Sequence, residues 1–125
     1  MLGKKILIVE DEAMLADVMR DELVNAGFDV SVARDGQEGL AMAQSVHPDL
    51  MMVDVLMPKM DGISMLKNLR ANPEFAKIPA SVLTNLNDSQ TIQDALESGA
   101  YDFLVKSNWN PKDLVKYVKE KLGIT

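Results

Sequence analysis

The chain has 125 residues, a net charge of −6 and 47% hydrophobic residues. This length fits one domain, so we expect residues 1–125 to form a single unit around one apolar core. The negative charge argues against direct binding of nucleic acid, because nucleic acid is itself negative. The sequence contains no cysteine and one histidine, His47. Any metal would therefore be held by oxygen ligands.

Segments long enough to enter a membrane are missing from the sequence. No apolar run approaches the ~20 residues that a bilayer-spanning helix needs. The apolar stretch near the start of the chain is about four residues long, against roughly 7–15 in a signal peptide. We therefore expect no membrane insertion and a cytoplasmic location.

Five short apolar segments predict strands, in chain order at residues 6–9, 30–33, 50–53, 80–84 and 103–105. The runs 6–9 and 50–53 are continuously apolar, which is typical of central strands covered on both faces. The run 30–33 alternates apolar and small or polar residues, which favours a strand at the edge of the sheet.

Each predicted strand is followed by a segment with an apolar helical face. These faces consist of Leu15, Val18, Met19 and Leu23; Leu40 and Ala43; Ile63, Leu66 and Leu69; Ile92, Ala95 and Leu96; and Leu114, Val115, Val118 and Leu122. Gly27 and Gly99 are expected just after the first and fourth helices, Asp88 is the predicted N-cap of the fourth, and Asn110-Pro111 opens the fifth. Five strands alternating with five helices predict an α/β domain with a parallel sheet and helices on both faces.

Polar residues stand at the carboxyl ends of four of the predicted strands. Glu10 and Asp11 come directly after the first strand and Asp54 after the third, so these carboxylates should meet at the carboxyl edge of the sheet. Three like charges need a positive partner, and Mg²⁺ prefers a few carboxylates plus water. Thr84 ends the fourth predicted strand and Lys106 follows the fifth, so both should lie at the same edge. A hydroxyl, an ammonium, a metal ion and a carboxylate nucleophile together can stabilise a phosphoryl group in transfer.

Four parts of the sequence resemble the receiver domain of bacterial response regulators. They are residues 6–12 (Ile-Leu-Ile-Val-Glu-Asp-Glu), residues 51–62 (Met-Met-Val-Asp-Val-Leu-Met-Pro-Lys-Met-Asp-Gly), Thr84, and residues 99–106 (Gly-Ala-Tyr-Asp-Phe-Leu-Val-Lys). The resemblance covers essentially the whole chain. It implies a flavodoxin-like, doubly wound fold with a five-stranded parallel sheet in the order 2-1-3-4-5, five helices, and a role in two-component signalling.

The resemblance also assigns the acceptor and the metal ligands. It implies that Asp54 is the phospho-acceptor and that Glu10 and Asp11 are the acid pair that holds Mg²⁺. Asp54 and the backbone carbonyl of Leu56 would complete the protein's share of the metal shell. The phosphoryl donor implied is a sensor histidine kinase or a histidine phosphotransfer protein.

The same resemblance implies how phosphorylation is read. Lys106 would contact the phosphoryl oxygens, Thr84 would hydrogen-bond to one of them after transfer, and Phe103 is the switch aromatic. The output is expected through a downstream protein or a fused output domain absent from this chain. We expect no enzyme activity beyond the chain's own phosphorylation and dephosphorylation.

Several positions depart from the common family pattern. Ser107 stands where proline usually follows the lysine, Asn85 replaces a small residue, and Phe103 replaces tyrosine. Leu56 and Leu86 occupy positions that the family uses to tune dephosphorylation. Both are apolar and cannot orient an attacking water, so we predict a long-lived phospho-aspartate.

Two other functions are considered beside the phosphorylation switch. One is a receiver-like protein-binding module that works without phosphorylation. The other is a Mg²⁺-dependent phosphatase, which is disfavoured because haloacid-dehalogenase-type enzymes need a second acid where this chain has Leu56. Glu12 is interpreted as a solvated acid that favours the N-terminus of the first helix.

Overall fold

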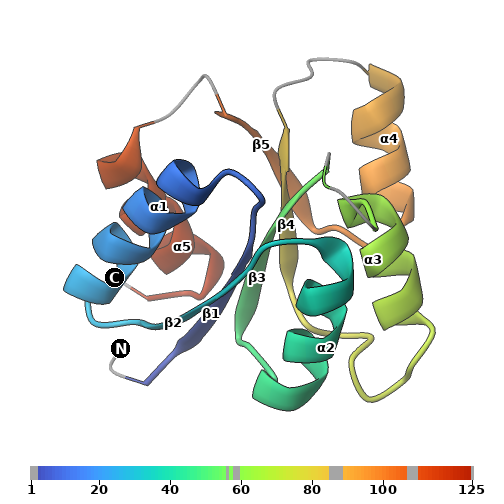
Figure 1. Ribbon diagram of the computed structural model, residues 1–125, viewed down its shortest axis with the longest axis horizontal. Coiled ribbons are helices and arrows are strands. Elements are labelled where there is room, and N and C mark those ends of the chain that lie inside the picture. Colours follow the sequence, from blue (N-terminus) through green and yellow to red (C-terminus); the bar gives the residue numbers. More distant parts are fainter. Residues whose placement is uncertain (1–2, 56, 58–59, 85–88, 107–109, 125) are drawn as a thin grey trace.

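A parallel sheet of five strands lies between two layers of helices (Figure 1). The computed structural model describes residues 3–55, 57, 60–84, 89–106 and 110–124. The strands are β1 (Lys5–Val9), β2 (Asp29–Ala33), β3 (Leu50–Asp54), β4 (Ala80–Thr84) and β5 (Asp102–Val105). Their order is β2-β1-β3-β4-β5, which confirms the predicted topology and places the alternating strand at an edge.

Helices cover both faces of the sheet. On one face lie α1 (Ala13–Asn25) and α5 (Pro111–Lys121), and on the other lie α2 (Gly36–Val46), α3 (Gly62–Arg70) and α4 (Ser89–Glu97) (Figure 1). Alternate side chains of the central strands pack against opposite helix layers. Leu7 packs on the α2–α3 side and Ile8 on the α1–α5 side. All five residues of β3 are buried, as its continuous apolar run predicts.

The helix ends follow the predicted local chemistry. Gly27 and Gly99 adopt positive φ angles of 101° and 105° just after α1 and α4, a conformation that glycine tolerates best. Asn110 caps α5 and forms a capping box with Asp113. The predicted N-cap Asp88 lies outside the described residues.

Two predicted core side chains are exposed. Val18 is 42% exposed, and Leu96 is 45% exposed. Helix α1 meets the sheet through a narrow stripe that includes Ala16 and Met19, and Val18 lies two residues from Ala16, on the other side of the helix. In α4 the small Ala95 is buried in place of its larger neighbour.

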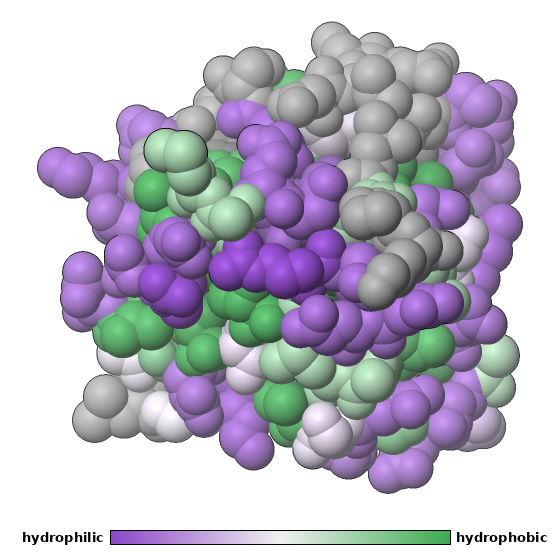
Figure 2. Space-filling view, viewed as in Figure 1, coloured by the Kyte–Doolittle hydropathy of each residue, from purple (hydrophilic) through white to green (hydrophobic). Residues whose placement is uncertain are grey.

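Hydrophilic residues cover most of the face seen in Figure 2, with smaller apolar patches between them. Across the described part of the chain, every helix is too short or too polar to span a bilayer.

A polar network fastens α5 to the sheet. The hydroxyls of Ser81 and Tyr117 share a hydrogen bond of 2.6 Å, and the ammonium of Lys121 lies 2.6 Å from the carboxylate of Asp102. The same ammonium lies 5.4 Å from the centre of the Tyr117 ring, within cation–π distance. These contacts tie α5 to both β4 and β5.

The network predicts a pH-dependent contribution to stability. Partial burial raises the pKa of Asp102, but hydrogen bonds from Lys121 and the backbone N–H of Phe103 outweigh it and hold that pKa below its usual value. A depressed carboxyl pKa stabilises the fold above the unfolded pKa, and this contribution is lost as the pH falls through the folded pKa. Asp102→Asn should therefore be less stable than the parent in urea unfolding at pH 7, and the difference should shrink below about pH 4. An equal difference at both pH values would contradict this interpretation.

Candidate functional site

Three carboxylates meet at the carboxyl edge of the central strands. Glu10 follows β1 and Asp54 ends β3, and these strands are paired so that Val9 lies opposite Val53. Carboxylate oxygens of Glu10, Asp11 and Asp54 lie within 4.8 Å of one another. Glu10 is 0% exposed and Asp54 5%, whereas Asp11 is exposed. The structure thus brings the three predicted acids together in a cluster that opens to solvent at Asp11.

Lys106 reaches this cluster from the end of β5. Its Nζ lies 3.0 Å from Oδ2 of Asp54 and 2.5 Å from Oε1 of Glu10. The lysine side chain is only 8% exposed, so these ion pairs are largely shielded from water. The predicted convergence of a lysine with the central carboxylate is confirmed.

Burial and mutual contacts shift the pKa values of Glu10 and Lys106. Burial, followed by a hydrogen bond with Asp54, raises the pKa of Glu10 to about 8, although Lys106 opposes this change. Burial alone would lower the pKa of Lys106, but its hydrogen bonds to Glu10 and Asp54 outweigh burial and raise it. The acids therefore exceed the positive charge available to them.

The carboxylate oxygens of the cluster fit a hard divalent cation. Oε2 of Glu10 is buried and has no hydrogen-bond partner among the described residues. A buried acceptor without a partner is costly, and a cation would satisfy it. Asp11 places an accessible carboxylate beside it, which leaves room for the waters that Mg²⁺ retains.

The predicted switch residues lie on the neighbouring strands. Thr84 is buried at the end of β4, one residue after Leu83, the residue that pairs with Asp54. Phe103 is half-buried on β5 and packs against the apolar cluster on the α2–α4 side of the sheet. Thr84 is thus at the edge where Asp54 lies, and Phe103 is not in the acidic cluster itself.

Four predicted positions lie outside the described residues: Leu56 with its carbonyl ligand, Asn85, Leu86 and Ser107. Their proposed effects on the metal shell, the loop after β4 and the phosphoryl lifetime stay predictions.

A glycine allows helix α3 to approach the acceptor strand. Gly62, the first residue of α3, donates its backbone N–H to the carbonyl of Val55 over 3.0 Å. A Cβ atom at Gly62 would lie 2.1 Å from the carbonyl oxygen of Asp54. The preceding residue, Asp61, caps the helix by accepting a hydrogen bond from the N–H of Ser64. The Asp61-Gly62 pair therefore fixes the backbone directly behind the central carboxylate.

Glu12 is the site residue whose role the sequence interpretation missed. It is the N-cap of α1, but its side chain makes no capping hydrogen bond. Its Oε1 lies instead 3.8 Å from Nζ of Lys106, while the side chain is 61% exposed. The prediction that Glu12 is solvated is confirmed, but its carboxylate is directed toward Lys106. Three consecutive acids after a buried strand are the signal that could have indicated this.

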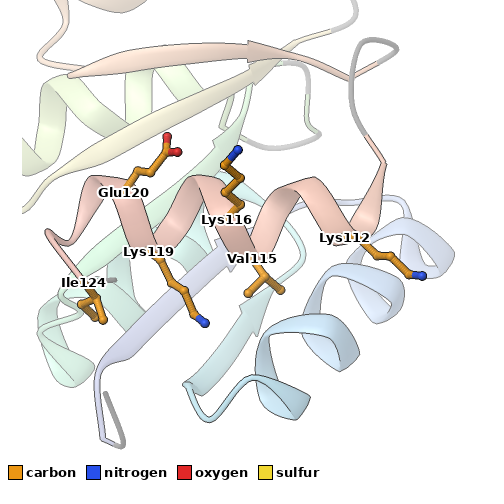
Figure 3. Close-up of a pocket in the computed structure, with 6 residues that line it drawn as sticks. All are labelled: Lys112, Val115, Lys116, Lys119, Glu120 and Ile124. Atoms are coloured by element: carbon orange, nitrogen blue, oxygen red, sulfur yellow. The ribbon is translucent and has the colours of Figure 1, made fainter.

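A surface depression of about 440 Å³ lies elsewhere, along the outer side of α5 (Figure 3). Its lining residues are Lys112, Val115, Lys116, Lys119, Glu120 and Ile124. None of them belongs to the acidic cluster, so this depression is separate from the candidate site.

Comparison with known proteins gives one consistent result. Residues 6–119 match the response regulator receiver domain family. A DNA-binding response regulator, MtrA of Mycolicibacterium paratuberculosis, is 36% identical over 121 residues, which are 97% of this chain and 52% of that protein. The chain therefore spans about half the length of the curated relatives that it matches.

Solved structures agree with the family match. The chemotaxis response regulator CheY4 of Vibrio cholerae superposes with a TM-score of 0.87 at 32% identity, covering 96% of this chain and 98% of that one. The Mn²⁺-bound form of the response regulator Rcp1 superposes with a TM-score of 0.79 at 29% identity, covering 94% and 91% of the two chains.

Proposed function

Because this chain belongs to the response regulator receiver domain family, we propose that Asp54 accepts a phosphoryl group from the phosphohistidine of a kinase or phosphotransfer protein. The observation that carries the proposal is the ammonium of Lys106, which lies 3.0 Å from the Asp54 carboxylate inside an acidic cluster. That arrangement places positive charge where the phosphoryl oxygens would arrive.

The transfer needs positioning more than acid–base chemistry. An oxygen of Asp54 would attack phosphorus, and the bond from phosphorus to the donor imidazole nitrogen would break, its electron pair leaving with the imidazole. Lys106 would stabilise the negative charge on the phosphoryl oxygens, and the Thr84 hydroxyl would donate a hydrogen bond to the product.

Glu10, Asp11 and Asp54 would hold Mg²⁺, together with the backbone carbonyl of Leu56. When bound, the ion supplies positive charge that neutralises the acids and the incoming phosphoryl oxygens. The unpartnered buried oxygen of Glu10 supports this assignment. The structural similarity to the response regulator Rcp1, which was solved in a Mn²⁺-bound form, also supports a divalent ion here.

We further propose that the phosphoryl group shifts the population between two packings of the β4–β5 side. Thr84 would follow the new oxygens, and Phe103 would move deeper into the space that this releases. The output surface would comprise α4, β5 and α5, read by a downstream protein or by a fused output domain. The relatives include DNA-binding regulators of about twice this length, which supports a fused domain as one arrangement.

We propose no enzyme activity beyond the chain's own phosphorylation and dephosphorylation.

The proposal is tested by amide NMR with Mg²⁺ and beryllofluoride, a mimic of the phosphoryl group. We expect shifts that begin around Asp54 and extend to Thr84, Phe103 and α5. Asp54→Asn, which removes the nucleophilic oxygen and keeps the side-chain size, should abolish them. A spectrum that does not respond to the mimic would favour the phosphorylation-independent binding module instead.

A further inference from the structure

The Glu12 carboxylate stands at the mouth of the site without belonging to its metal-ligand set. It lies 3.8 Å from Lys106 Nζ and is 61% exposed, in contrast to the buried Glu10 and Asp54. A capping side chain at the N-cap accepts a hydrogen bond from the first turn, but the Glu12 carboxylate accepts none. Its charge is therefore directed over the site.

Glu12 changes the net charge that an incoming phosphodonor meets. Glu10, Asp11, Glu12 and Asp54 carry four negative charges when ionised, and Lys106 carries one positive charge. A divalent ion would leave one net negative charge at the site, whereas the same site without Glu12 would be neutral.

We propose that Glu12 determines donor specificity by repelling small dianionic phosphodonors from the mouth of the site. Transfer from a free acyl phosphate is then slower than it would be with a neutral residue at this position. This inference rests on the proposed function of Asp54.

The reaction used to test it is phosphorylation by acetyl phosphate. An oxygen of Asp54 attacks phosphorus, the bond between phosphorus and the acetyl oxygen breaks, and the electron pair of that bond leaves with acetate. The product is an acyl phosphate on Asp54, and no further reactant is needed.

Glu12→Gln should raise the second-order rate constant with acetyl phosphate at saturating Mg²⁺. At low ionic strength we expect about a three- to tenfold increase, which corresponds to the Coulomb energy between a dianion and one charge in water at an assumed separation of roughly 6–8 Å. The increase should fall below about twofold at 0.5 M salt, where such interactions are screened. Phosphoramidate, which carries less negative charge, should show a smaller increase.

The same variant should bind Mg²⁺ more weakly, by about two- to fivefold in an NMR titration without phosphodonor, because it removes a nearby negative charge. A structural disturbance of the site would lower both quantities together. Opposite changes in metal affinity and in phosphorylation rate therefore identify the charge of Glu12 as the cause.

Two variants sharpen the test. Glu22→Gln makes the identical chemical change on α1, ten residues along the chain from Glu12 and outside the proposed output surface, and should alter neither quantity. Glu12→Asp keeps the charge at the mouth but shortens the reach to Lys106, and should behave like the parent. If it behaves like Glu12→Gln, the contact with Lys106 is responsible and the inference is wrong.

The inference is also overturned if Glu12→Gln is no faster than the parent or if its increase is independent of salt. Either result leaves the acceptor role of Asp54 intact when the parent is phosphorylated. Incorporation of no phosphoryl group on Asp54 by either the parent or Glu12→Gln would overturn the proposed function as well.

Discussion

Replacement of Lys106 by methionine is expected to slow phosphorylation of Asp54 by acetyl phosphate at least about a hundredfold at saturating Mg²⁺. Methionine preserves much of the length of the side chain and removes its charge. Removal of one preorganised donor at developing negative charge costs about 10²–10³-fold in enzymes. Among the described residues, Lys106 is the cationic side chain paired with Asp54, and no second ammonium in that part of the chain can replace it.

Without Mg²⁺ the same variant should also be less stable. Glu10 is fully buried, and its ion pair with Lys106 would be lost. Breaking a buried ion pair typically costs about 3–5 kcal/mol. We expect a smaller loss, since burial raises the pKa of Glu10 to about 8 and the carboxyl can keep a proton. Saturating Mg²⁺ should recover most of this loss in urea unfolding.

Lys116→Met provides the matched control, because Lys116 is an exposed lysine of α5 at the depression shown in Figure 3. This variant should keep both the phosphorylation rate and the stability of the parent. A Lys106→Met protein that retains more than a tenth of the parent rate would show that the ammonium does not stabilise the transferring group.

The fold could be predicted because each segment carries its own periodicity. The apolar run at residues 50–53 indicates a strand buried on both faces wherever it lies, and β3 is the middle strand of the sheet. The site could be predicted for a topological reason. Glu10 and Lys106 are 96 residues apart, but a parallel sheet brings the carboxyl ends of β1 and β5 to one edge.

Features that depend on packing partners could not be predicted in this way. The helical pattern of α1 includes Val18, but only the position of the sheet decides that Ala16 is buried and Val18 is exposed. Arg70 is another example: its guanidinium donates hydrogen bonds to the backbone carbonyls of Phe75, Ala76 and Gly99. Such contacts link an ordinary helical arginine to a segment 29 residues away, and no local pattern reveals them.

Gly62→Ala is expected to damage both the fold and the acceptor site. The added Cβ would lie 2.1 Å from the carbonyl oxygen of Asp54, so the backbone of α3 or β3 must move. Overpacking of this kind typically costs about 1–3 kcal/mol, which exceeds the gain of at most about 1 kcal/mol in helix propensity. A displacement of Asp54 by about 1 Å can slow a positioned reaction about 10²-fold. Urea unfolding and the rate with acetyl phosphate measure the two effects.

Gly39→Ala separates this clash from a general effect of alanine in a helix. A Cβ at Gly39 would lie 2.8 Å from a methyl group of Val9 and 3.0 Å from the sulfur of Met65. These are side-chain atoms. The flexible methionine can shift, and the stiffer valine side chain must move slightly, but no backbone carbonyl stands in the way. We therefore expect a smaller loss of stability and a nearly unchanged phosphorylation rate for Gly39→Ala. If both alanine variants lose the same rate, the position of Asp54 does not depend on the close approach of α3, and its geometry is set by the sheet alone.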